Sequence, residues 1–228
     1  MRAALEPRIL ILCPLAREWS FLVKTFEATR HVKHLHDLKI EAAYLPEWRS
    51  LVAPAGHGKT QFAVQAQYLI GRFPSVELVV CAGAAGSLAP ELSVGDVVVG
   101  TETVEHDYRQ LFATRPLPRF PGHGPSIDGL RRSARGVSGF HVAFGVIASG
   151  DEDVVSSERA QAIRDQTGAA CVAWEGRGAA RAALFNGIGS LEIRAVTDAA
   201  DKEAPQRFDA NLPFAMANLA NLLRLWLR

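Results

Sequence analysis

The feature that most constrains this chain is an alternation of short apolar runs with longer amphipathic segments. The runs are rich in β-branched residues, which predicts strands, and the segments between them repeat apolar residues at helical spacing. Strands are expected at Ile9–Cys13, Leu51–Ala53, Leu78–Ala82, Val97–Val99, Val142–Ala148, Ala170–Ala173 and Ile193–Val196. Helices are expected at Glu18–Thr29, Thr60–Phe73, Ser156–Gln166, Arg177–Phe185 and Ala210–Leu227. This order predicts an α/β fold whose strands are buried and mostly parallel.

The alternation continues along the whole chain, so one domain is expected over residues 1–228. No internal repeat, low-complexity tract or linker divides the sequence, and its 48% hydrophobic residues suffice for one sizeable core. Residues 110–126 are rich in Pro and Gly and lack periodicity, which predicts a long loop. Such a loop can be a lid over a substrate or a flexible surface excursion, and the sequence favours neither.

Charge and cysteine usage exclude several classes of partner. The 25 basic residues nearly cancel the 24 acidic ones, so no field is expected to attract nucleic acid or a membrane surface. No window approaches the ~20 apolar residues of a membrane span, and the N-terminal apolar run is too short for a cleavable signal. Cys13, Cys81 and Cys171 each lie in an apolar run, which indicates buried thiols and a cytoplasmic setting. A small molecule or another protein is the expected partner.

The segment APAGHGKTQFAV has some features of a phosphate-binding loop. It places Gly58, Lys59 and Thr60 between a strand and a helix, as that loop requires. The full motif also needs Gly where this chain has Ala53, and no downstream apolar run ends in an Asp suited to Mg²⁺. We therefore interpret Gly56 and Gly58 as a tight turn into a helix.

Three carboxylates and a glycine-rich turn follow the expected strands. Glu18, Glu175 and Asp198 each come after a strand, and Gly83 and Gly86 leave bare backbone after another. Open α/β sheets form their ligand crevices at this edge, so we expect these groups to converge. Two carboxyls in different environments can act as general base and general acid, and a third can accept hydrogen bonds from a ribose diol.

Longer motifs make the chain similar to a known family. CPLAREWSFL, APAGHGKTQFA, CAGAAGSLAPELSVGDVVV, HDY, ASGDEDVV, VAWEGRGAA and IRAVTDAAD follow one another in the family's order and approximate spacing. They resemble the nucleoside phosphorylase/hydrolase superfamily and, most closely, its 5'-methylthioadenosine/S-adenosylhomocysteine nucleosidases. The resemblance covers nearly the whole chain. It implies a twisted, mixed β-sheet flanked by helices, a nucleoside substrate, no cofactor, and a homodimer that completes the pocket.

The resemblance assigns roles to several residues. Glu18 resembles the general base that activates water, and Asp198 resembles the acid that protonates purine N7. Glu175 would bind the ribose hydroxyls, and Arg194 matches an arginine near the water and the base carboxylate. The backbone of Val154 lies where relatives bind the exocyclic group of the purine.

Of the other matched positions, some keep the family's residue type and some depart from it. Trp174 stands beside the sugar in place of Met, and Phe208 matches an aromatic ring that closes over the base. Gly86 and Ala84 belong to the glycine-rich turn at the substrate, where Ala84 replaces a Ser that helps hold the water. Asp153 occupies the position of a Phe that stacks on adenine. An anion cannot stack, so the identity of the base is less constrained than the reaction.

The first loop, PLAREW, separates hydrolysis from phosphorolysis. Phosphorylases of the superfamily hold phosphate there with a glycine and an arginine, whereas Glu18 would repel phosphate and activate water. The resemblance therefore implies hydrolysis of the N-glycosidic bond of a 5'-substituted purine nucleoside. Asp153 and Arg115 keep a futalosine-type hydrolase or a purine nucleoside phosphorylase as alternatives. Ala84 and Asp153 motivate a further alternative, a non-catalytic nucleoside-binding or storage protein.

Taken singly, these residues also have structural interpretations. Asp198 could cap the following helix, and Glu18 could be a solvated carboxylate in a first helical turn. Trp174 and Phe208 could be core or interface aromatics. Together with the family pattern, however, all four residues favour a nucleoside site.

The histidines point to no further site. His57 lies in a turn and is expected to be solvated rather than catalytic. His106 and Asp107 are not accompanied by a second His or a Cys pair at metal-ligand spacing, so no metal site is expected.

Overall fold

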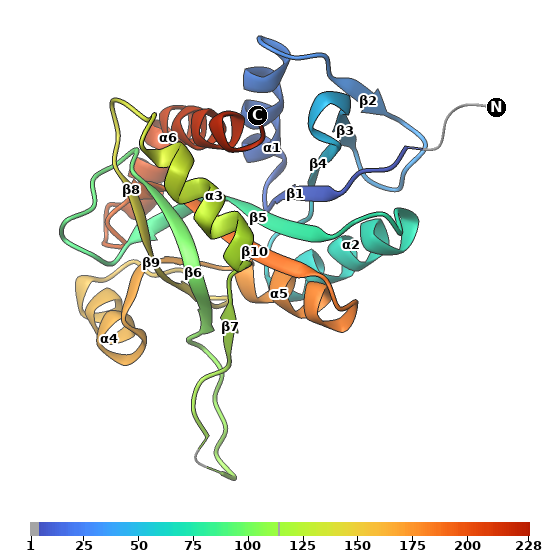
Figure 1. Cartoon of the computed structure of the whole chain (residues 1–228). Coiled ribbons are helices and arrows are strands. Elements are labelled where there is room, and N and C mark those ends of the chain that lie inside the picture. Colours follow the sequence, from blue (N-terminus) through green and yellow to red (C-terminus); the bar gives the residue numbers. More distant parts are fainter. Residues whose placement is uncertain (1–4, 114) are drawn as a thin grey trace.

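The computed structural model describes residues 5–113 and 115–228, so residues 1–4 of the predicted domain lie outside it. The strands are β1 (Ile9–Cys13), β2 (Lys33–Leu35), β3 (Ala42–Leu45), β4 (Ser50–Pro54), β5 (Leu78–Ser87), β6 (Val97–Glu105), β7 (Arg119–Pro121), β8 (Val142–Ser149), β9 (Ala169–Ala173) and β10 (Gly189–Asp198). The helices are α1 (Ala16–Glu27), the 3₁₀ turn η1 (Pro46–Trp48), α2 (Lys59–Arg72), α3 (Gly124–Ala134), α4 (Ser157–Thr167), α5 (Gly176–Phe185) and α6 (Ala204–Trp226). The predicted single-domain α/β fold with a mixed sheet is confirmed (Figure 1).

The sheet is partly closed on itself. Strands β5, β10, β6, β8 and β9 pair in succession, and β9 pairs back with β5, so these five strands form a ring. Strands β1, β4, β3 and β2 continue outward from β5. Because β1, β4, β5 and β10 are parallel, their carboxyl ends meet at one edge of the sheet.

Two layers of core cover the two faces of the sheet. Side chains alternate between the faces along a strand, and β1 shows this clearly. Ile11 and Cys13 contribute to the core shared with α1, α3 and α6, whereas Leu10 and Leu12 contribute to the core shared with α2 and α5. The helices therefore hold the carboxyl edge of the central strands in place from both sides (Figure 1).

The central strands are longer than predicted. β5 and β10 continue to Ser87 and Asp198, so Gly83, Gly86 and Asp198 lie within strands and not after them. The small residues of CAGAAGS have low strand propensity, which concealed the continuation of β5. Helix α6 begins at Ala204, before its expected start.

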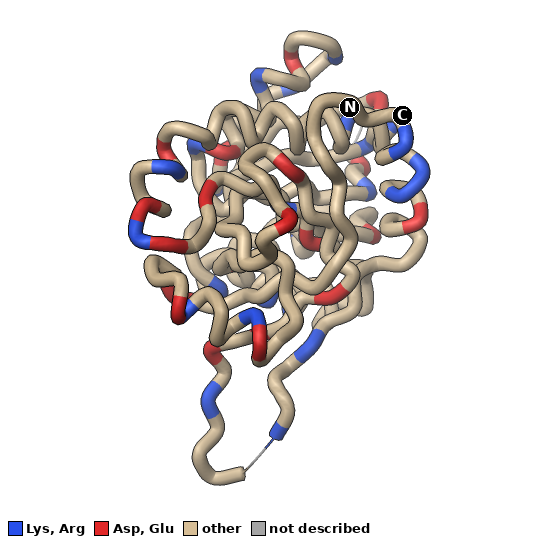
Figure 2. The backbone as a smooth tube through the Cα atoms, turned by 90° about the vertical axis from the view of Figure 1, so that its left-hand side faces the viewer, with Lys and Arg blue, Asp and Glu red and all other residues tan. Residues whose placement is uncertain are grey.

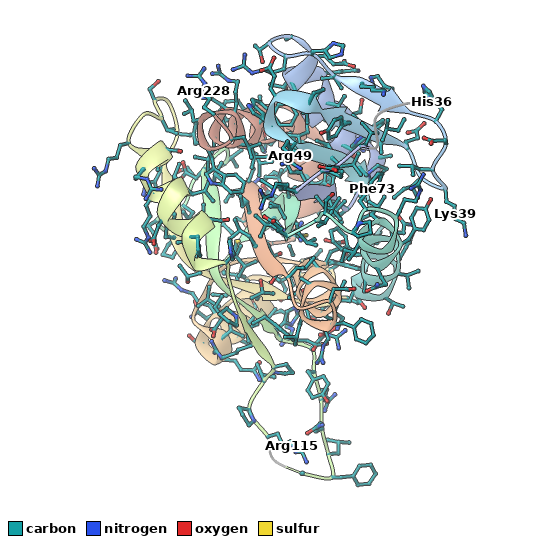
Figure 3. All side chains as sticks on the ribbon, turned by 45° about the vertical axis from the view of Figure 1, so that its right-hand side comes forward. His36, Lys39, Arg49, Phe73, Arg115 and Arg228 are labelled. Carbon is teal, nitrogen blue, oxygen red and sulfur yellow. The ribbon has the colours of Figure 1, made fainter. Side chains whose placement is uncertain are left out.

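The predicted long loop is wrong in its second half. That half contains β7, which pairs with β6, and the start of α3. The remainder forms an arm, defined as residues 108–113 and 115–118, which projects from the bottom of the body in Figure 1. Leu111 and Phe112 on the arm are almost fully exposed, and Arg115 lies on it far from the rest of the protein (Figure 3).

Figure 2 shows both acidic and basic positions distributed along the backbone. No helix among residues 5–113 and 115–228 is both long and apolar enough to cross a membrane. Within the same residues, no group of three or more His, Cys, Asp or Glu side chains is arranged to hold a metal ion.

Candidate active site

A cavity of about 400 Å³ opens at the carboxyl edge of the central strands. Its walls come from the β1–α1 junction, β5, the β8–α4 loop, the β9–α5 junction, β10 and α6. Every residue that the sequence predicted for the site lines it: Glu18, Ala84, Gly86, Asp153, Val154, Trp174, Glu175, Arg194, Asp198 and Phe208. No described residue of the 110–126 segment does, so the lid interpretation finds no support within a single chain.

Glu18 lies in the first turn of α1 but faces the sheet. Its side chain is only 2% exposed, so the interpretation as a solvated carboxylate is wrong. Oε1 accepts a hydrogen bond from the Ala84 N–H at 2.7 Å, and Oε2 accepts one from the Leu15 N–H at 2.8 Å. A Cβ at Gly83 would lie 2.7 Å from Oε1, so glycine is needed for this close approach.

The protonation of Glu18 is set by competing effects. Burial raises its pKa from 4.5 to about 7, and the Ala84 N–H and the Arg194 guanidinium partly oppose this by favouring the ionised form. A carboxyl with a pKa near neutrality can accept and release a proton under working conditions. Glu18 is therefore suited to general base catalysis.

Arg194 is the centre of a buried polar network. Its Nε donates to Glu192 Oε1 at 2.8 Å, and its Nη2 donates to Glu175 Oε2 and to Cys81 Sγ, both at 3.2 Å. Nη1 donates to the Ala84 carbonyl at 3.3 Å. The guanidinium is thus fixed between carboxylates at the inner wall of the cavity. Sequence reasoning did not single out Glu192.

Glu175 lies where β9 meets α5 and is buried and charged. Oε1 is 3.2 Å from the Gly58 N–H, which donates to it, and 3.4 Å from His57 Nδ1. Burial alone would raise the pKa of Glu175, but His57, Arg194 and the Gly58 N–H together hold it below its ordinary value. An ionised carboxylate in a cavity can accept hydrogen bonds from two hydroxyl groups.

His57 is a cavity residue that sequence reasoning left out. Its ring packs against Trp174 with 4.1 Å between centroids, and half of its side chain remains exposed. The Glu175 carboxylate, 3.4 Å from Nδ1, and the nearby charge of Asp153 raise the pKa of His57, although partial burial opposes the shift. The sequence signal that could have identified His57 is its place between Gly56 and Gly58, which predict a tight turn. In the structure both glycines have φ of +85°.

Asp198 is the last residue of β10 and lies beside Gly86 of the glycine-rich strand β5. Oδ2 accepts from the Thr197 hydroxyl at 2.8 Å and Oδ1 from the Ala200 N–H at 3.0 Å. Burial raises the pKa of Asp198, although both hydrogen bonds oppose the shift. The helix-cap interpretation is wrong, because α6 starts only at Ala204 and its N–H groups are not bound by Asp198.

The spacing of the two carboxyls follows from β5. Glu18 lies against Gly83, and a Cβ at Gly86 would lie 2.9 Å from Asp198 Oδ1. The two glycines are three residues apart, which is about 10 Å along an extended strand, so Glu18 and Asp198 approach β5 at separate points. A sugar and the base attached to it can lie between them.

In the outer part of the cavity, apolar side chains form the wall and a charged side chain lies at the rim. Val154 is buried, Phe208 is half-buried, and Asp153 is exposed at the rim. The guanidinium of Arg17 lies 5.8 Å from the Phe208 ring and donates to Asp209 at 2.8 Å. Arg17 is therefore engaged away from Glu18.

Lys59 connects two of the cavity loops. Its Nζ donates to Asp107 at 2.6 Å and to Glu105 at 3.1 Å, and its N–H donates to Asp151 at 2.8 Å. Arg177 also donates to Glu105, at 2.8 Å. With its charge paired in this way, Lys59 fixes the Gly56–Gly58 turn against the β8–α4 loop. It is not available to cradle a phosphate, in agreement with the turn interpretation.

Comparison with known proteins places this geometry in context. The family model of the phosphorylase superfamily matches residues 8–228. The 5'-methylthioadenosine/S-adenosylhomocysteine nucleosidase of Actinobacillus succinogenes is 33% identical over 71% of this chain and 73% of its own. The aminodeoxyfutalosine nucleosidase of Helicobacter pylori is 29% identical over 76% of this chain and 78% of its own.

A solved structure shares the fold along nearly the whole chain. The crystal structure of the 5'-methylthioadenosine/S-adenosylhomocysteine nucleosidase from Neisseria meningitidis, in complex with methylthio-immucillin-A, matches with a TM-score of 0.84. The two chains are 32% identical, and the match covers 96% of this chain and 97% of the other. The strands and helices that form the cavity therefore lie within the shared fold.

Proposed function

The chain belongs to the phosphorylase superfamily, and from this premise we propose how its cavity acts on a nucleoside. It is a nucleosidase, which hydrolyses the N-glycosidic bond of a purine nucleoside and releases the free base. Its proposed substrates are 5'-methylthioadenosine and S-adenosylhomocysteine. The observation that carries the mechanism is the pair of buried carboxyls, Glu18 and Asp198, which line one cavity and approach one strand at two different glycines, Gly83 and Gly86.

Glu18 and Asp198 divide the proton transfers between them. The oxygen of a water molecule bonds to C1' of the ribose while Glu18 accepts a proton from that water. The C1'–N9 bond breaks, its electron pair moves onto the purine, and Asp198 delivers a proton to N7. The raised pKa of each carboxyl supports this division, because one must take up a proton and the other must hold one until the base departs.

Glu175 and Arg194 act on the sugar and the water. The ionised Glu175 carboxylate accepts hydrogen bonds from the ribose hydroxyls and lies beside the sugar as positive charge develops on it. Arg194 holds Glu175 through its Nη2 and keeps a positive charge near Glu18. Hydrogen bonds within the fold hold both side chains, so little reorganisation is required during the reaction.

The outer cavity receives the base and the 5' group. The Val154 backbone binds the exocyclic group of the purine, Phe208 packs on the base, and Trp174 lies beside the sugar. His57 and Asp153 add polar groups that favour a second candidate, aminodeoxyfutalosine. The similarity to the Helicobacter pylori aminodeoxyfutalosine nucleosidase supports that candidate.

A homodimer is the proposed assembly. Val64 on α2 and Leu184 and Phe185 on α5 are exposed, and α2 packs against α5. Leu111 and Phe112 expose further apolar surface on the arm. Exposed apolar side chains gathered in this way are typical of surfaces that contact another chain.

The proposed location is the cytoplasm. Cys13, Cys81 and Cys171 are all buried and unpaired, and burial raises the pKa of each thiol. Unpaired thiols are stable in a reducing compartment, which supports this location.

A nucleoside panel tests the proposed function. The purified protein is incubated with 5'-methylthioadenosine, S-adenosylhomocysteine, aminodeoxyfutalosine and inosine, with and without phosphate, and free base is quantified by chromatography. We expect base release without phosphate and fastest turnover with a 5'-substituted nucleoside. Release that requires phosphate would identify a phosphorylase. Binding without release from any nucleoside would identify a binding or storage protein.

A further inference from the structure

Glu192 is a buried carboxylate that the mechanism above does not use. It lies in the middle of β10 and does not line the cavity, so it cannot touch a substrate there. Oε1 accepts from Arg194 Nε at 2.8 Å, and Oε2 accepts from the Thr103 hydroxyl at 2.6 Å. Both oxygens are therefore engaged within the fold.

The space around Glu192 is made by glycines. A Cβ at Gly176 would collide with the Glu192 carboxylate, and a Cβ at Gly100 would come within 3.5 Å of the Glu192 Cβ. Burial of an ionised carboxylate is costly unless a charged partner and hydrogen bonds compensate for the lost water. Arg194 is that partner, so Glu192 and Arg194 form one unit.

Arg194 faces charged or titratable groups from four elements. Glu18 approaches from α1, Glu175 from the β9–α5 junction, Cys81 from β5, and Glu192 from its own strand. Glu192 occupies the Nε side of the guanidinium, so the Nη atoms are directed to Glu175 and to the strand beside Glu18. A negative charge behind Arg194 weakens the positive potential that Arg194 exerts on Glu18.

We propose that Glu192 is a positioning residue that fixes the Arg194 guanidinium and offsets its charge, so that Glu18 stays basic enough to take a proton from water. The inference rests on the proposed function, because it concerns the residue that activates water there. Glu192 acts only through Arg194 and has no contact with the nucleoside.

Glu192→Gln tests the charge. The amide keeps an oxygen for Arg194 Nε and nearly the same volume, but it removes the negative charge. We expect the acid limb of the pH profile of kcat/KM to move to lower pH by about 0.5 to 1 unit, because Arg194 then favours ionised Glu18 more strongly. The plateau kcat falls a few-fold, roughly, because a weaker base takes the proton less readily. KM stays close to that of the wild type.

Two further variants make the test specific. Glu192→Asp keeps the charge but shortens the reach to Arg194, so kcat falls about tenfold while the acid limb stays in place. Glu102→Gln removes a partly exposed carboxylate on β6 that pairs with Arg119, and its profile should match the wild type.

The outcomes separate this inference from the proposed function. Wild-type protein that releases no base overturns the proposed function. An active Glu192→Gln protein with the wild-type acid limb overturns the role of Glu192, even if its Tm is lower. If Glu192→Gln does not fold, Glu192→Asp decides: a lowered kcat with an unshifted limb supports the inference, and a wild-type kcat overturns it.

Discussion

The two carboxyls at the two ends of the cavity differ in their neighbours more than in their burial. Glu18 is 2% and Asp198 7% exposed, and burial raises the pKa of both. Glu18 accepts from two backbone N–H groups and lies near the buried cation Arg194. Asp198 accepts from one hydroxyl and one N–H, and its charged surroundings are the opposing pair Asp201 and Arg207.

The difference shows how one side-chain type can perform two tasks. A cation beside Glu18 allows it to ionise near neutral pH, as a base must. No buried cation contacts Asp198 among the described residues, which favours its protonated form, as an acid requires. Substitution of Glu18 and substitution of Asp198 should therefore affect different steps of the reaction.

Loss of the base should have the largest effect. Glu18→Gln removes the group that accepts a proton from water, and we expect kcat/KM for 5'-methylthioadenosine to fall at least ~100-fold. Steady-state assays of base release measure this. Glu27→Gln is the matched control, because Glu27 lies on the same helix and only pairs with His34 at the surface. A Glu18→Gln protein with the wild-type rate would remove Glu18 from the mechanism.

Loss of the acid should be comparably severe for a purine leaving group. Asp198→Asn keeps the shape of the side chain and its acceptor oxygen but cannot deliver a proton to N7. We expect kcat to fall at least ~100-fold in the same assay. Asp209→Asn, which alters an exposed acid on α6, should retain the wild-type rate. Equal rates for wild type and Asp198→Asn would contradict the assignment.

The stability of the wild-type protein and that of Glu18→Gln should depend differently on pH. The pKa of Glu18 is about 7 in the folded state and 4.5 ordinarily, so the folded protein binds this proton more tightly than the unfolded chain. The resulting stabilisation is complete below pH 4.5 and is lost as pH rises through about 7. Glu18→Gln has no such titration.

The free energy of unfolding of Glu18→Gln, relative to wild type, should therefore increase by roughly 3 kcal/mol between about pH 4 and pH 8. Urea unfolding at both pH values measures it. A difference that stays constant with pH would show that the folded state does not raise the pKa of Glu18.

The pH profile of kcat/KM should show the titration of Glu18. Below the Glu18 pKa of about 7, kcat/KM should fall about tenfold per pH unit, because the base becomes protonated. In a Glu175→Gln protein that still turns over, the acid limb should move to lower pH, because the Glu175 charge raises the pKa of Glu18, and an absent acid limb in wild type would contradict the account.

The sequence predicted the residues that line the cavity better than the elements and buried residues that surround them. Glu18, Glu175 and Asp198 were identifiable because apolar runs predict strands and because parallel strands share one carboxyl edge. The arm was not predictable in shape, since its sequence has no periodicity. β7 and α3 were missed because they lie in or directly after the Pro- and Gly-rich segment.

Glu192 illustrates what local patterns miss. It lies directly before the predicted strand Ile193–Val196, between Leu191 and Ile193, where an acid resembles the solvent-facing position of an edge strand. Its spacing to Arg194 was an available signal, because residues two apart on a strand share a face. Burial of that face, however, depends on the closed ring of strands, which is a long-range pairing that no local window contains. His57 was missed for a related reason, since its contacts, Trp174 and Glu175, lie at the β9–α5 junction, which is distant in sequence.

The most direct test of the division between base and acid is a substrate whose leaving group needs no proton. The hydrolysis of 4-nitrophenyl riboside is compared for wild type, Glu18→Gln and Asp198→Asn by release of 4-nitrophenolate. We predict that Asp198→Asn approaches the wild-type rate on this substrate, whereas Glu18→Gln stays at least ~100-fold slower. Equal losses in both variants, or recovery of Glu18→Gln alone, would contradict the account.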